Sequence, residues 1–316
     1  MVVVDENWRV YAEAWDPSYG APAAFDLDGT ESVERAESGS GHLIGPTVAH
    51  PMPLCFVDGR RRVELSLWAE QPGSGERVPG LLGAYAVGAV TITPGQPAAY
   101  QGIRVGRLAI WGAGHAGDLA HHNGYEWRSF SSAADEPAKL LQVLQNQMRS
   151  AEGALALDAA GVGWNVVLDG PLNFVRRLDD LVTGYVKSHH RRLLPEPAHA
   201  AVPGLEVGGR TPIYAIGADR YTCYARVGRP GKGSSPWGGI VRLEFPTSAG
   251  LDRVAERASA LAALLPAYAG QAHRDPRAPV NLTPVRNLEG HLSHLLGPVD
   301  LAVRAAREAV VAGLAR

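Results

Sequence analysis

The sequence predicts a mixed α/β protein in which helices pack against one sheet, together with an additional antiparallel group of strands. Three observations support this fold class. Apolar stretches separated by turn residues between positions 54 and 111 predict an antiparallel meander. A long helical pattern at 136–159 is followed by a compact apolar strand at 164–168. Amphipathic patterns at 251–265 and 299–314 predict closing helices, and the whole order is typical of a sheet covered by helices.

Residues 1–50 differ from the rest of the chain in composition. They are acidic, irregular in pattern and rich in Gly, Ser, Pro and Ala. Such a composition is typical of a loosely structured segment. We therefore expect an N-terminal arm that docks a partner, followed by one domain that spans residues 51–316 and includes the additional strands.

The meander begins where the pattern becomes apolar, after Pro53. Residues 54–57 predict a short strand that leads into an Asp-Gly step, and residues 61–68 alternate as in a half-buried strand. Two further strands are expected at 81–92 and 103–111.

The helix predicted at 136–159 has Asp135 as its N-cap and Pro137 in its first turn. Another strand is expected at 181–187, after the strand at 164–168. The second antiparallel group is assigned to residues 211–217, 221–227 and 239–245.

Bulk composition leaves the function open. The formal net charge is −2, whereas a protein that coats duplex DNA without specificity is usually basic. The longest apolar stretch, 81–92, is shorter than the roughly 20 residues that span a bilayer, so no membrane partner is expected. The start of the chain lacks a secretory pattern, and Cys55 and Cys223 fit buried thiols in a reducing compartment. A cytoplasmic protein without a Cys-x-x-Cys zinc site is therefore predicted.

Two apolar runs end in the same Asp-Gly step, at Asp58 and at Asp169. A single Asp-Gly pair after a strand is most often only a turn. The functional alternative is a carboxylate held at the edge of a rigid sheet, where it binds a hard divalent cation.

Glu152 adds a third acid to this pattern. It lies on the apolar stripe of the predicted helix, in step with Met148 and Leu155. Burying an unpaired carboxylate is costly, so either a base such as Arg149 pairs with it or a cation compensates it. The second alternative gives three acids around Mn²⁺ or Mg²⁺, with which enzymes hydrolyse phosphodiesters without a nucleophilic side chain.

These motifs together resemble those of NurA, an RNase H-like nuclease that works with the HerA translocase on DNA ends. The resemblance covers residues 53–296 loosely. Thr283 stands where the family often has Tyr, and Arg60 where it commonly has Ser. The motifs that carry the resemblance are FVDG at Asp58, Glu152 in the helix before LDGPL at Asp169, YVKS at Lys187, and TPVRNLEGH ending at His291.

The resemblance implies an RNase H-like mixed sheet with flanking helices, whose catalytic and metal-binding residues are Asp58, Glu152, Asp169 and His291. It implies Mn²⁺ as the cofactor, with Mg²⁺ as the alternative ion. It also implies a homodimer, a HerA-type hexameric ATPase as partner, and DNA as substrate. The implied activities are 5′ to 3′ exonuclease and single-strand endonuclease action on DNA ends, in end resection and repair.

Basic residues follow the acidic motifs closely in the sequence. If the two aspartates meet, these side chains converge near the metals and contact phosphates, whereas solvated charge at strand ends is the ordinary alternative. The DNA-contact candidates are Arg60, Arg61, Arg62, Lys187, Arg191 and Arg192.

Two other functions stay open. Asp26 and Asp28, in FDLDGT, resemble the nucleophile motif of haloacid-dehalogenase-like phosphatases, although the residues before them do not form a strongly apolar strand. The other alternative is a non-catalytic RNase H-like subunit that docks on a motor ATPase.

Overall fold

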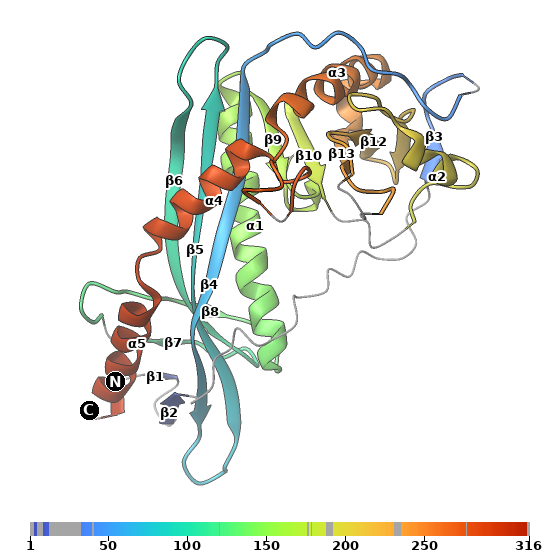
Figure 1. Ribbon diagram of the computed structural model, residues 1–316. Coiled ribbons are helices and arrows are strands. Elements are labelled where there is room, and N and C mark those ends of the chain that lie inside the picture. Colours follow the sequence, from blue (N-terminus) through green and yellow to red (C-terminus); the bar gives the residue numbers. More distant parts are fainter. Residues whose placement is uncertain are drawn as a thin grey trace.

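One large sheet organises the molecule, and a smaller two-stranded sheet accompanies it (Figure 1). The structure is a computed structural model, and it describes residues 3–4, 9–12, 33–39, 41–119, 121–175, 177, 179–187, 192–230, 235–275 and 277–314. None of the helices described combines the length and the apolar character needed to cross a bilayer.

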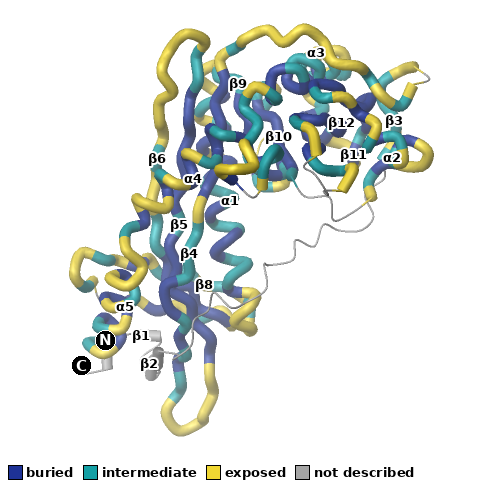
Figure 2. The backbone as a smooth tube through the Cα atoms, in the orientation of Figure 1, coloured by how far each residue is buried: buried dark blue, intermediate teal, exposed yellow. Residues whose placement is uncertain are grey.

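Three long antiparallel strands form the elongated half of the large sheet: β4 (Leu54–Glu70), β5 (Arg77–Ile92) and β6 (Ala99–Trp111). The central strand β5 is buried along nearly its whole length, because helices cover both faces of the sheet there. Figure 2 shows this buried centre and the exposed turns at the ends of the hairpins.

Helix α1 (Pro137–Gly161) leads from the meander into two parallel strands, β9 (Asn165–Asp169) and β10 (Val182–Val186). Strand β9 inserts beside β4 and runs parallel to it, and β10 runs parallel to β9. Met148, Leu155 and Ala156 of α1 pack against Val57 of β4 and Leu168 of β9. This contact fixes α1 on one face of the sheet.

The sheet continues beyond β10 into the additional antiparallel group, and β13 (Ile240–Pro246) is its first strand. Strand β13 pairs with β10 and with β12 (Arg220–Arg226), and β12 pairs with β11 (Tyr214–Ile216). The edge strand is β3 (Val33–Arg35). The short helix α2 (Ala198–Ala201) lies between β10 and β11 in the chain.

Helices α3 (Leu251–Leu264) and α4 (Thr283–Leu295) cover the face opposite α1. Phe56 of β4 belongs to the same buried cluster as Leu261 of α3 and Leu288 and Leu292 of α4. Helix α5 (Val299–Leu314) follows and packs on the lower part of β4. The sheet thus lies between α1 on one side and α3 and α4 on the other.

Four short strands complete the described fold. Strand β8 (Arg128–Ser131) pairs parallel to β6, and β2 (Arg9–Ala12) pairs with the far end of β4. The two-stranded sheet consists of β1 (Val3–Val4) and β7 (Gly117–Asp118).

The predicted fold class, a mixed α/β sheet with flanking helices and an additional antiparallel strand group, is confirmed. Two local predictions are wrong. Residues 54–57 and 61–68 are parts of one strand, because pairing with β5 continues through the Asp-Gly step. The region 1–50 is not irregular throughout, since it contributes β1, β2 and β3 to the sheets. Its proposed docking role stays a prediction.

Candidate functional site

The register of two neighbouring strands brings Asp58 and Asp169 together. Val57 of β4 is the parallel partner of Leu168 in β9, and each aspartate is the next residue along its strand. Successive side chains alternate between the faces of a sheet. Phe56 and Val167, two residues before the aspartates, belong to the cluster on the α4 side. Asp58 and Asp169 therefore project from that same face.

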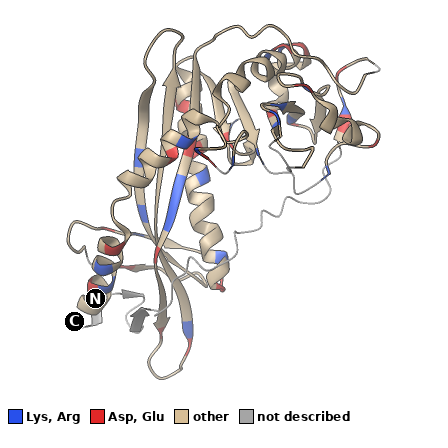
Figure 3. Ribbon diagram, in the orientation of Figure 1, with Lys and Arg blue, Asp and Glu red and all other residues tan. Residues whose placement is uncertain are grey.

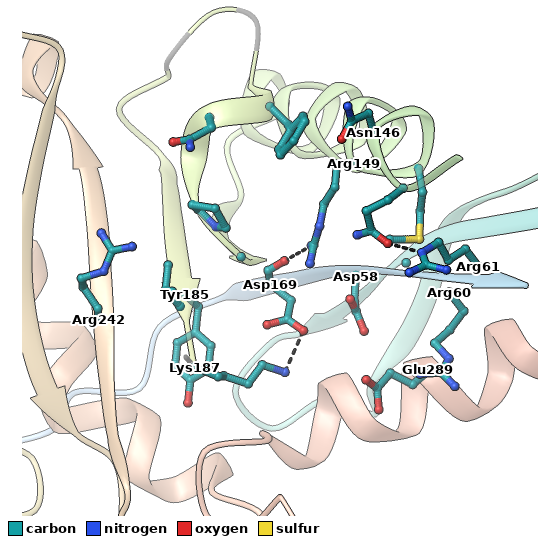
Figure 4. Close-up of a pocket in the computed structure, with 18 of the residues that line it drawn as sticks. Asp58, Arg60, Arg61, Asn146, Arg149, Asp169, Tyr185, Lys187, Arg242 and Glu289 are labelled. Atoms are coloured by element: carbon teal, nitrogen blue, oxygen red, sulfur yellow. Dashed lines mark hydrogen bonds and ion pairs between the residues drawn. The ribbon is translucent and has the colours of Figure 1, made fainter. Parts of the chain in front are cut away.

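Glu289 of α4 completes a group of three carboxylates. Asp58, Asp169 and Glu289 each offer one ligand oxygen, and these three atoms lie within 4.8 Å of one another. Asp58 is only 4% exposed, and its Oδ2 atom is buried without a hydrogen-bond partner among the residues that the structure describes. Figure 4 shows the three side chains directed toward one another.

Two basic residues offset part of this negative charge. Lys187 Nζ lies 2.7 Å from Asp169 Oδ2 and donates a hydrogen bond to Asn281 Oδ1, also at 2.7 Å. Arg277 Nη1 donates to Glu289 Oε1 at 2.9 Å, and its second terminal nitrogen pairs with Oε2 at 2.5 Å. Burial opposes ionisation of Glu289, but the Arg277 guanidinium outweighs it and lowers the pKa of this carboxyl.

Asp58 differs from its two neighbours because it forms no ion pair within the part of the chain that the structure describes. Burial raises the pKa of Asp58 well above its usual value, and the charges of Asp169 and Glu152 raise it further. Lys187 acts in the opposite direction. The site therefore holds one deeply buried carboxyl that has no ion-pair partner among the described residues.

Glu152 lies on the other face of the sheet, outside the group of three. It is 1% exposed, and a side chain at Gly59 would collide with its carboxylate. Arg149 Nη1 pairs with Glu152 Oε2 at 2.8 Å and also donates to the backbone oxygen of Asp169. Burial raises the pKa of Glu152 to about 7, against the lowering effect of Arg149. Pairing with Arg149 was the open alternative for this residue, and it is the arrangement observed.

His291 is not brought to the three carboxylates. Its ring stacks on Tyr100, with centroids 4.3 Å apart and planes 4° from parallel. Residues two apart on an α-helix point in directions about 200° apart, so Glu289 and His291 face opposite ways. Sequence analysis expected His291 beside Asp58 and Asp169, but the structure has Glu289 at that position. The signal for Glu289 was its place on the buried stripe with Val285 and Leu292.

The predicted DNA-contact residues separate into three groups. Arg60 and Arg61 line the pocket above the carboxylates, where Arg61 also pairs with Gln145, and Lys187 lies within the site itself. Arg62 instead donates to Leu296 and Gly297 carbonyls, and its role is structural. Arg192 is exposed and pairs with Glu196, whereas Arg191 lies outside the described residues, as do Asp26 and Asp28 of the phosphatase alternative.

The pocket above the acids has a volume of about 1110 Å³. Figure 3 shows the basic stretch of β4 beside the acidic positions of the site. Sequence analysis named Arg149 only as a possible partner of Glu152. It did not assign Arg242 and Arg277 to the site, because they come from distant segments that only the fold brings together.

The residues present fit a hard divalent cation. All three donors are carboxylate oxygens, which Mg²⁺, Mn²⁺ and Ca²⁺ prefer. One of them, the buried Oδ2 of Asp58, has no hydrogen-bond partner within the described part of the chain. A cation at this position would supply the missing counter-charge.

Comparison with family models gives no match, and comparison with curated proteins gives none either. Among solved structures, the chain is similar to the NurA nuclease from Sulfolobus solfataricus. The two share 11% sequence identity with a TM-score of 0.47, over 81% of this chain and 86% of that one.

Proposed function

We propose that this protein is a divalent-metal-dependent nuclease that hydrolyses phosphodiester bonds of DNA. The observation that carries the proposal is the group formed by Asp58, Asp169 and Glu289, with oxygens within 4.8 Å of one another below a pocket lined by arginines. Acidic groups alone attract cations, whereas a phosphate substrate also requires positive charge nearby. Both are present in one pocket.

Asp58, Asp169 and Glu289 would hold Mn²⁺, or Mg²⁺ as the alternative ion. A bound divalent ion supplies a polarised water and stabilises negative charge on a phosphoryl oxygen. Glu152 contributes from the opposite face of β4: through Arg149, it helps to fix the backbone at Asp169. In this proposal Glu289 takes the place that the sequence analysis gave to His291.

The basic side chains of the pocket bind and orient the DNA strand. Arg60, on the same face of β4 as Asp58, and Arg61, on the α1 face, both line the pocket and are placed to contact phosphate oxygens. Arg277 keeps Glu289 aligned through two hydrogen bonds, and Lys187 does the same for Asp169 through one ion pair. Fixed side chains of this kind lower the cost of orienting the reacting groups.

The resemblance of the sequence motifs extends this proposal. The substrate would be single-stranded DNA and DNA ends, degraded in the 5′ to 3′ direction and by endonuclease action. The protein would act as a homodimer in the cytoplasm with a HerA-type hexameric ATPase, in end resection and repair. The arm formed by residues 1–50 would contribute to docking that partner.

The test is incubation of end-labelled single-stranded DNA with Mn²⁺, with Mg²⁺ and with a chelator. We expect metal-dependent shortening of the DNA, and a loss of rate of about 100-fold or more in Asp58→Asn and in Glu289→Gln, since even residues that only support metal ligands cost up to that much. Asp158→Asn is the matched control, because Asp158 is exposed and pairs with Arg104 away from the pocket. Shortening that persists in chelator, or full activity of Glu289→Gln, would contradict the proposal.

A further inference from the structure

A second pocket adjoins the larger one at Glu289. It has a volume of about 500 Å³, and its lining includes Tyr100, Arg286 and Ser293. Arg60, Arg277 and Glu289 line both this pocket and the larger one. Of the three carboxylates, Glu289 therefore borders both pockets, whereas Asp58 and Asp169 border only the larger one.

Tyr100 gives the second pocket a rigid aromatic surface. Its ring stacks on the His291 imidazole, nearly parallel, which restricts the rotation of both rings. The residue is nevertheless 44% exposed, a high value for a large aromatic side chain. An exposed ring held by a stacked neighbour is suited to stack on an unpaired base, because every base has a π face.

The second pocket also contains arginines that form no ion pair among the described residues. Among the residues that the structure describes, neither Arg60 nor Arg286 forms an ion pair, whereas Arg277 is paired with Glu289. Two unpaired guanidinium groups beside an exposed aromatic ring match the repeating phosphate and base of a single strand.

We propose that this second pocket binds nucleotides of a single-stranded nucleic acid next to the carboxylate site, with Tyr100 stacking on a base and Arg60 and Arg286 contacting phosphates. The inference rests on the proposed nuclease function and deepens it. His291 then acts as a positioning residue that holds Tyr100. A strand in this arrangement extends from the second pocket past Glu289 into the larger pocket.

The test is equilibrium binding of labelled oligothymidine, followed by fluorescence anisotropy in the presence of a chelator so that no cleavage occurs. Oligomers of about 4 and about 16 nucleotides cover the range of typical single-strand sites. Tyr100→Ala is expected to weaken binding of the longer oligomer by about fivefold or more, and to affect the shorter one less. Tyr100→Phe keeps the ring and should keep the affinity. Val105→Ala, an exposed substitution on the same strand, is the control.

Several outcomes overturn the inference. Equal binding by Tyr100→Ala and the unchanged protein does so, and so does an equal loss in Tyr100→Phe, which would assign the effect to the hydroxyl group. Absence of oligonucleotide binding by the unchanged protein overturns it as well. Arg286→Gln provides an independent measurement, because loss of one phosphate contact lowers the slope of log affinity against log salt by about 0.7.

The result that would contradict the proposed nuclease function differs from the results that would contradict binding in the second pocket. If the unchanged protein binds the oligomers through Tyr100 but cuts no DNA with any divalent ion, the second pocket is supported and the nuclease proposal is not. If it cuts DNA while the Tyr100 variants bind normally, only the second pocket is ruled out.

Discussion

The buried carboxyl of Glu152 predicts an unusual pH dependence of stability for the metal-free protein. Burial raises its pKa from 4.5 to about 7. An acid with a raised pKa in the folded state binds its proton more tightly there than in the unfolded chain. Its contribution to stability is therefore complete below pH 4.5 and is lost as the pH rises through about 7.

The size of the effect follows from the shift. One pKa unit corresponds to about 1.4 kcal/mol, so the change at Glu152 amounts to about 3 kcal/mol between pH 4.5 and pH 8. Asp58 adds a loss of the same sign, because burial and neighbouring acids also raise its pKa. Such a loss is a large fraction of the 5–15 kcal/mol that is typical of folded proteins.

The assay is urea unfolding of chelator-treated protein at intervals from pH 4.5 to pH 8. The free energy of unfolding should fall as the pH rises, and the fall should be smaller by about 3 kcal/mol in Glu152→Gln, which has no proton to lose. Asp158→Asn controls for removing one exposed acid from the same helix. Parallel pH curves for the unchanged protein and Glu152→Gln would refute the reasoning. Addition of Mn²⁺ should restore stability at high pH, by about 2.7 kcal/mol at a hundred times its Kd.

Three further outcomes are expected. Gly59→Ala should lower the free energy of unfolding, measured in urea, by about 1–3 kcal/mol, because the added methyl group meets two side chains of α1. Gly161→Ala is the control and should leave this free energy unchanged, because a methyl group there meets no atom within 4 Å. Glu64→Gln should lower the free energy of unfolding by about 3–5 kcal/mol in the same assay, because this buried carboxylate pairs with two arginines. An unchanged urea midpoint would contradict that role. Lys187→Gln should lower the slope of log affinity against log salt for single-stranded DNA by about 0.7. An unchanged slope would show that Lys187 does not contact a phosphate.

Sequence reasoning identified Asp58 and Asp169 as a pair because each follows an apolar run with the same Asp-Gly step. It placed Asp58 at the end of a strand, since Asp-Gly is a strong turn signal. Tertiary context overrides that signal: β4 continues because β5 pairs with it on both sides of the step, with Asp58 opposite Gly88. Gly59 does not form a turn; its lack of a side chain lets Met148 and Glu152 of α1 pack close to β4.

Glu289, the third member of the carboxylate group, shows a different limit of prediction from sequence. The same stripe argument that selected Glu152 also applies to Glu289, which lies in step with Val285 and Leu292. The resemblance to a family motif drew attention to His291 instead, two positions away on the opposite side of the helix. The parallel pairing of β4 with β9 joins residues more than a hundred positions apart, and no local pattern predicts such a register.

The negative charges of the site are compensated unequally among its four buried or partly buried acids. Asp169 is paired with Lys187, Glu289 with Arg277, and Glu152 with Arg149, so three acids are compensated by the chain itself. Asp58 is the acid left over among the described residues, and its unpartnered oxygen is buried. In the proposed function, Asp58, Asp169 and Glu289 would hold a divalent ion, which would supply the counter-charge for Asp58. Lys187 and Arg277 would keep the other two carboxylates aligned.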